Sequence, residues 1–156
     1  MNILGLDLGS VPAYCLIWGD GRIEWEQLGG PKGWLGYPRH ERVIRFGEFI
    51  QDKLPLVDVV AYEEVQTSFG YGSWVIFRQE GALLYLAREI PFFGINPSTL
   101  KKFAVPGRKG TKALMMDSAR LFLKNRGLDP GELTDNEADA ILVAAWALKN
   151  LKKEKK

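Results

Sequence analysis

The chain has 156 residues, of which 46% are hydrophobic and 26% charged, and its formal net charge is +2. This length suits one domain with its own core, and the composition excludes a disordered or fibrous chain. No apolar stretch approaches the ~20 residues of a membrane span, and the first residues lack the pattern of a signal peptide. The single cysteine, Cys15, excludes an intrachain disulfide and is expected in a buried strand. We therefore expect one domain over 1–156 in the cytoplasm.

The first part of the chain has the pattern of an antiparallel meander. Three strands are expected, at 2–7, 13–18 and 22–28. Asp20-Gly21, between the last two, is a hairpin turn signal. A loop rich in glycine and proline then precedes a helix with one apolar face, at 40–54.

The remainder alternates between strands and helices. The run 57–62 has the continuous apolar and β-branched residues of a buried parallel strand, and 92–95 is a second short strand. Further helices are expected at 73–88, from Thr99, at 111–125 and at 136–151. This order predicts an α/β fold with a mixed sheet, in which a three-strand antiparallel meander continues into parallel strands and helices cover both faces.

Three carboxylates stand at the ends of expected elements. Asp7 ends the first strand, Glu63 follows the buried strand, and Asp139 lies in the first turn of the last helix. Strand ends that share one edge of such a sheet converge on a crevice, so these side chains are expected to meet there. Taken singly, each has an ordinary explanation: an Asx turn, a pairing with lysine, or a helix N-terminus. Together they predict an oxygen-ligand site for Mg²⁺ or Mn²⁺.

Positive charge gathers in a loop-like segment that also contains Pro106 and two glycines. Its basic residues are Lys101, Lys102, Arg108, Lys109 and Lys112. A net charge of +2 is weak support for a nucleic-acid partner, but such a cluster favours contacts with phosphates. The lysine-rich end of the chain is interpreted as a solvated helix end.

Four segments together resemble the RuvC-type Holliday junction resolvases of the RNase H-like superfamily. They are ILGLDLGS at 3–10, VVAYEEVQ at 59–66, INPSTLKKFAVPGRKGTKALM at 95–115 and NEADAILVAAWAL at 136–148. The looser shape of the sequence is similar to the phage-borne branch. The resemblance implies one RNase H-like nuclease domain, acting in the cytoplasm of a bacterial or phage-infected host cell.

The resemblance also implies a ligand set. Two Mg²⁺ or Mn²⁺ ions per active site are expected, held by three carboxylates: Asp7, Glu63 and Asp139. The fourth ligand is Asp135, one helical turn before Asp139, or else Asn136, whose carbonyl oxygen also suits a hard cation. Glu64 is the alternative to Glu63, although strand alternation lets only one of the two face the site.

The activity implied is hydrolysis of phosphodiester bonds in four-way (Holliday) or branched DNA by two metal ions. Lys112 is expected beside the scissile phosphate, and Lys101 on the DNA backbone. Because a four-way junction has near two-fold symmetry, we expect a homodimer that makes two symmetric nicks, with the helix at 73–88 as its interface.

Aromatic residues lie in the glycine-rich loop after Glu63 and just beyond it. Phe69 and Tyr71 are expected to contact DNA, by stacking on a base or by wedging a base step. Trp74 is expected to be the first core residue of the following helix. His40 is expected on the surface and not as a general base.

Three alternatives remain at this point. A small RNase H-like RNA-processing nuclease shares the length, the fold and the Asp-x-Gly opening. A DNA-binding module without catalysis follows if the carboxylates do not converge. The segment LGLDLGS also resembles the phosphate-binding loop of sugar kinases, actin and Hsp70-type ATPases, but those proteins need two such domains and a second phosphate loop.

Overall fold

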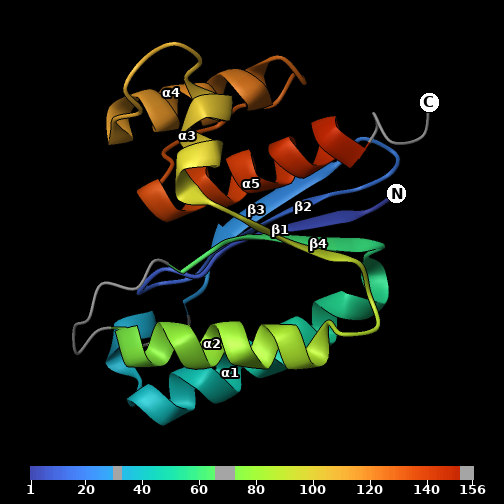
Figure 1. Ribbon diagram of the computed structural model, residues 1–156, viewed down its shortest axis with the longest axis vertical. Helices are drawn as coiled ribbons and strands as arrows, with labels where there is room; N and C mark the ends of the chain where they lie inside the picture. Colours follow the sequence, from blue (N-terminus) through green and yellow to red (C-terminus); the bar gives the residue numbers. More distant parts are fainter. Residues whose placement is uncertain (30–32, 66–72, 152–156) are drawn as a thin grey trace.

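Residues 1–29, 33–65 and 73–151 are described by the computed structural model of the chain (Figure 1). The strands in these residues are β1 (Ile3–Asp7), β2 (Ala13–Ile17), β3 (Ile23–Gln27), β4 (Val59–Glu63) and β5 (Phe92–Ile95). The α-helices are α1 (Arg39–Lys53), α2 (Ser73–Leu86), α3 (Pro97–Ala104), α4 (Lys112–Lys124) and α5 (Asp135–Leu151). Two short 3₁₀ turns, η1 (Trp34–Gly36) and η2 (Leu54–Leu56), flank α1.

The strands form one mixed sheet in the order β3-β2-β1-β4-β5. The meander of β1, β2 and β3 is antiparallel, whereas β4 runs parallel to both β1 and β5. One face of the sheet carries α1 and α2, and the other carries α3, α4 and α5 (Figure 1). The predicted α/β fold, with its meander, parallel strands and helices on both faces, is confirmed.

The ends of the elements lie within one or two residues of their expected positions. The helix expected from Thr99 begins at Pro97. Its N-cap is Asn96, whose side-chain oxygen accepts a hydrogen bond from the Ser98 amide at 3.0 Å. Proline suits the first helical position because its missing N–H has no intrahelical partner there.

Alternation along the strands divides the core into two layers. Leu4 and Val60 are buried against the layer of α1 and α2. Ile3 belongs to the opposite layer, which α5 fills. Asp7 and Glu63 are in phase with Ile3 and end their strands. Both carboxylates therefore lie on the α5 side of the sheet.

The helix α5 packs directly on β1. A Cβ atom at Gly5 would lie 2.6 Å from the backbone nitrogen of Ala144 and 2.7 Å from the carbonyl oxygen of Ala140. These distances are shorter than van der Waals contact, so only glycine permits the approach. The N-terminal part of α5, with Asp139, is thereby held beside the end of β1.

A capping box fixes the start of α5. The amide of Glu137 donates to the hydroxyl oxygen of Thr134 at 3.2 Å. In return, the Glu137 carboxylate accepts hydrogen bonds from the amide and the hydroxyl of Thr134, at 2.8 and 3.0 Å. This reciprocal pair satisfies helix donors that have no partner within the helix. Asp135 and Asn136 follow directly in the first turn, on a fixed backbone.

The expectation that Trp74 is a core residue is wrong. Its side chain is 38% exposed, and the Arg78 guanidinium stacks on its ring at 3.9 Å from the centroid. The buried stripe of α2 consists instead of Val75, Gln79 and Leu83. α2 is apolar on more than one side, so the sequence pattern alone does not indicate which stripe meets the sheet.

Two smaller expectations are confirmed. Cys15 is fully buried in β2, and His40 is exposed at the start of α1. Over the described ranges, no helix has both the length and the apolar character needed to cross a membrane.

Candidate functional site

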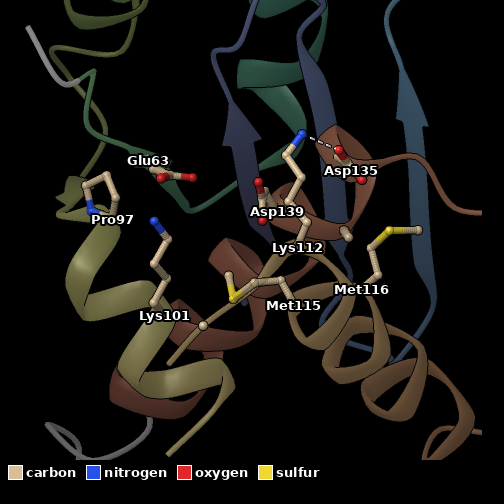
Figure 2. Close-up of a pocket in the computed structure, with 10 residues that line it drawn as sticks. Glu63, Pro97, Lys101, Lys112, Met115, Met116, Asp135 and Asp139 are labelled. Atoms are coloured by element: carbon tan, nitrogen blue, oxygen red, sulfur yellow. Dashed lines mark hydrogen bonds and ion pairs between the residues drawn. The ribbon is translucent and has the colours of Figure 1, made fainter. Parts of the chain in front are cut away.

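A cavity of about 200 Å³ lies where the end of β4 meets the starts of α3, α4 and α5. Its charged lining residues are Glu63, Lys101, Lys112, Asp135 and Asp139 (Figure 2). A second hollow shares Glu63, Lys101 and Asp139 with it and extends to Asp7, Gly9 and Asn136. We call the two hollows together the carboxylate crevice. The carboxylates of β1, β4 and α5 thus share one concave surface.

Asp7 is mostly buried at the end of β1. Its Oδ1 accepts a hydrogen bond from the Gly9 amide at 3.0 Å, so the side chain also closes the turn that follows the strand. Burial, and after it the neighbouring charges of Asp139 and Glu63, together raise the pKa of Asp7 to about 8. The hydrogen bond from the Gly9 amide acts in the opposite direction, because it favours the ionised form.

The other two carboxyl groups are also hard to ionise. Burial and the charge of Asp139 raise the pKa of Glu63 to about 7. Burial and the charge of Asp135 raise the pKa of Asp139 to about 6. The ammonium of Lys101, which points into the crevice beside Glu63 (Figure 2), favours the ionised form of both groups. Three half-buried carboxyl groups that repel one another form a site that gains stability from a cation.

Glu63 and Glu64 lie on different sides of β4. Glu63 lines both hollows of the crevice. Glu64 is exposed and lines only the wider one. Its carboxylate lies against β5, where a Cβ at Gly94 would be 2.8 Å from Glu64 Oε1. Of the two, Glu63 is the residue in phase with Asp7.

The first turn of α5 holds Asp135 and Asn136 in different ways. The ammonium of Lys112 donates to Asp135 Oδ2 at 2.6 Å, which raises the pKa of Lys112 (Figure 2). The amide nitrogen of Asn136 donates to Gln27 Oε1 at 3.2 Å. The other end of that amide, Oδ1, lies next to the turn of Gly9.

The turn at Gly9 leaves room among oxygen atoms. A Cβ there would lie 3.2 and 3.4 Å from the two carboxylate oxygens of Asp7 and 3.5 Å from Asn136 Oδ1. These donors, with Glu63 and Asp139 nearby, are the oxygen ligands that hard divalent cations prefer. The residues present therefore fit Mg²⁺ or Mn²⁺ in chemistry. Within the described part of the chain, no three His, Cys, Asp or Glu side chains already stand close enough to hold one ion.

The predicted basic residues divide into two groups. Lys101 and Lys112 line the crevice. Lys102, Arg108 and Lys109 are exposed outside it. Two further predicted residues, Phe69 and Tyr71, lie outside the described residues.

Sequence reasoning missed several residues that shape the crevice. Gly110 packs on the stem of Lys101, and a Cβ there would be 3.0 Å from the Lys101 Cβ and Cγ atoms. Met115 and Met116 form part of the wall. Gln27 is the partner of Asn136 although 109 positions separate them. A glycine in a basic loop is a signal that can be found in advance, but no local pattern marks Gln27.

Comparison with known proteins identifies the class of fold. No protein-family model and no curated protein sequence matches the chain. Among solved structures, it is similar to Thermus thermophilus RuvC in complex with a Holliday junction substrate, with a TM-score of 0.72, 20% identity and 96% of each chain covered. A second Thermus thermophilus RuvC structure gives a TM-score of 0.67 and 21% identity, again over 96% of both chains.

A viral protein shows the same likeness. The structure of the Fowlpox virus resolvase with its substrate Holliday junction DNA gives a TM-score of 0.57 and 17% identity, over 95% of this chain and 99% of that one. At these identities the comparisons establish the fold. The chain has the RNase H-like fold of the RuvC-type resolvases, as the sequence resemblance implies.

Proposed function

We propose that the chain is a metal-dependent endonuclease that resolves four-way or branched DNA junctions. The observation that carries the proposal is the meeting of Asp7, Glu63 and Asp139 in one crevice with Lys101 and Lys112 at its wall. Half-buried carboxylates supply a site for divalent cations, and the lysines supply a site for phosphate. The RuvC-type fold over nearly the whole chain supports the same conclusion, with 1–156 acting as a single nuclease domain.

The ligands we assign are Asp7, Glu63 and Asp139, with a fourth oxygen from the first turn of α5. These residues would hold two Mg²⁺ or Mn²⁺ ions, whose chemistry would be to activate the attacking water and to stabilise the leaving 3′ oxygen. The carboxylates supply charge and position, and none acts as a nucleophile. Because their pKa values are raised, cation binding displaces protons from the crevice and becomes stronger as the pH rises from 6 to 8.

Lys101 and Lys112 have separate tasks in this proposal. Lys101 offsets the charges of Glu63 and Asp139 in the free protein, and it contacts the DNA backbone when substrate is bound. Lys112 leaves its ion pair with Asp135 and offsets the charge that develops on the scissile phosphate. The pair is solvent-exposed, with the Lys112 side chain 84% accessible, so separating it costs little.

The exposed basic residues extend the phosphate-binding surface beyond the crevice. Lys102, Arg108 and Lys109 contact the arms of the junction through phosphates, which adds affinity without sequence choice. Phe69 and Tyr71 contact the bases near the branch point. A protein with these contacts acts on DNA in the cytoplasm of a bacterial or phage-infected cell.

Two symmetric nicks require two active sites, so we assign a homodimer with α2 at its interface. The outward stripe of this helix carries Trp74, Phe77 and Tyr85, which are 38, 39 and 68% exposed. Arg78 and Arg88 stack on the first and last of these rings. Exposed aromatic and arginine side chains in one stripe are the composition of an interface core.

The experiment that tests the proposal compares a labelled four-way DNA junction with a linear duplex of the same arms. Wild type and Asp7→Asn are assayed in Mg²⁺ and in Mn²⁺. Paired symmetric nicks in the junction alone, lost in Asp7→Asn, are expected. Cleavage of RNA in place of the junction would assign an RNA-processing nuclease, and binding without cleavage in either metal would assign a DNA-binding module.

A further inference from the structure

The side-chain amide of Asn136 spans the space between two strands of the sheet. Strand register aligns Asp7 of β1 with Ala13 of β2, and Ala13 with Gln27 of β3. Asp7 and Gln27 therefore stand in one row, two strands apart, on the side of the sheet that faces α5. Asn136, from the first turn of α5, donates to Gln27 at one end of this row and has its Oδ1 next to Gly9, in the turn that follows Asp7.

The middle of the row makes room for Asn136. Ala13 is fully buried and has only a methyl group. A larger side chain there would extend from the sheet between Asp7 and Gln27. The small residue therefore leaves space between the two ends of the row, on the face that α5 covers.

The hydrogen bond to Gln27 determines which end of the amide faces the crevice. Asn136 Nδ2 donates to Gln27 Oε1 at 3.2 Å. The oxygen and nitrogen of an amide diverge from one planar carbon, so with Nδ2 directed at Gln27 the oxygen Oδ1 is directed away from it, towards Gly9. A Cβ atom at position 9 would lie 3.5 Å from Asn136 Oδ1, and the two carboxylate oxygens of Asp7 lie near the same position.

Without an acceptor at position 27, the amide has a better alternative. Rotation by half a turn would place Nδ2 against the Asp7 carboxylate, where a neutral donor satisfies a buried negative charge. In that orientation the Nδ2 hydrogens of Asn136 face the proposed cation site, where a ligand oxygen is needed. With its Oε1 turned to Asn136, as in the structure, Gln27 stabilises the oxygen-presenting state of that side chain.

The neighbouring Asp135 has a different partner in the structure. Its carboxylate accepts a hydrogen bond from Lys112 at 2.6 Å. The two residues thus divide their tasks, because Asp135 positions Lys112 while Asn136 faces Asp7.

We propose that Gln27 is a positioning residue that holds the Asn136 amide with its oxygen towards Asp7, so that Asn136 serves as the neutral fourth oxygen ligand of the crevice. This inference rests on the proposed metal site. It assigns to the β3 edge a role in metal affinity, although Gln27 touches neither metal nor DNA.

The test is a titration of the DNA-free protein with Mn²⁺, followed by electron paramagnetic resonance. Gln27→Met keeps the length of the side chain and removes the acceptor, whereas Gln27→Glu keeps the acceptor. Gln51→Met is the matched control, because Gln51 is an exposed glutamine of α1, on the opposite face of the sheet. Gln27→Met is expected to weaken Mn²⁺ binding by about 10–100-fold, the usual effect of losing a residue that orients a ligand.

Gln27→Glu and Gln51→Met are expected to bind Mn²⁺ at least as tightly as wild type. Gln27→Met and Gln51→Met are expected to keep the wild-type Tm in EDTA. A double variant distinguishes the loss of Asn136 orientation from a general disturbance of the site. In Asn136→Asp, either orientation of the side chain presents an oxygen, so adding Gln27→Met is expected to change affinity by less than about threefold.

The outcomes distinguish a failure of the role assigned to Gln27 from a failure of the proposed metal site. Equal Mn²⁺ affinity in wild type and Gln27→Met overturns the role of Gln27 and leaves the metal site intact. An equal loss in Gln27→Glu, or the same loss in the Asn136→Asp background, also overturns it. A wild-type protein that binds no Mn²⁺ overturns the proposed metal site and the inference together.

Discussion

Replacing Asp7 with asparagine is expected to stabilise the metal-free protein while abolishing its activity. The substitution keeps the shape of the side chain and the oxygen that accepts the Gly9 amide hydrogen bond at 3.0 Å. It removes a buried charge that burial, Asp139 and Glu63 all disfavour. A residue that destabilises the fold yet stands at the end of a core strand is expected only where function requires it.

The magnitude follows from proton linkage. The pKa of Asp7 is 3.8 in an ordinary environment and about 8 here. Between these values the folded state binds more protons than the unfolded state, so the free energy of unfolding falls as the pH rises. Each pH unit between the two pKa values lowers the free energy of unfolding by about 1.4 kcal/mol. The ionisation of Asp7 therefore costs the folded state at most about 5 kcal/mol at pH 8.

The measured gain is expected to be smaller than that limit. Glu63 and Asp139 share the repulsion, and the asparagine amide is itself partly buried, so we expect about 1–3 kcal/mol at pH 8. For a domain of this size this corresponds to a rise in Tm of about 3–10 °C. At pH 4.5 Asp7 is protonated in the folded wild type, and the difference between the two proteins should fall to about a fifth of its value at pH 8, because the linkage disappears only below the ordinary pKa of 3.8.

The assay is thermal unfolding in EDTA from pH 4.5 to pH 8, repeated with Mg²⁺. Mg²⁺ is expected to raise the Tm of wild type more than that of the variant, because only a bound cation stabilises the folded state. Asp20→Asn is the control: Asp20 makes the same kind of turn with the Arg22 amide, but it is exposed and its pKa is lowered. A variant that melts at or below wild type at pH 8 in EDTA would refute the reasoning.

Three further predictions concern the lysines, the core and α2. Lys101→Ala/Lys112→Ala should weaken junction binding and reduce the slope of log K against log salt by about 2, in a gel-shift titration; an unchanged slope would remove both lysines from the phosphate contacts. Gly5→Ala should cost at least about 2 kcal/mol in urea unfolding, because its Cβ would lie 2.6 Å from the Ala144 nitrogen; wild-type stability would contradict the close packing of α5. Tyr85→Asp should yield a monomer in sedimentation experiments, because a charge enters the outward stripe of α2; a persistent dimer would place the interface elsewhere.

Much of the fold could be predicted because local patterns and general topology rules agree. The Asp20-Gly21 turn predicts the hairpin of β2 and β3. The apolar run of β4 predicts a buried parallel strand. The approach of Asp7 and Glu63 follows from the rule that parallel strands end at one edge of a sheet. Both residues can be recognised in the sequence because carboxylates are unusual at the end of an apolar strand.

Other features had no local signal. Trp74 and Val75 are adjacent apolar residues of α2, and which of them is buried depends on how the helix is rotated against the sheet. The sequence shows that a glycine stands in a strand at position 5. It does not show why glycine is required there, which is the close approach of the α5 backbone from a distant part of the chain.

By itself the sequence determined the order of the elements, the chemistry of the carboxylates and lysines, and the class of fold that they resemble. These depend on the residues alone and on patterns with a period of two or 3.6 residues. Only the tertiary structure decided that Lys112 pairs with Asp135 and that Asn136 turns its oxygen from Gln27 towards Asp7. Such pairings depend on distances between distant segments, which exist only once the sheet and α5 have packed together.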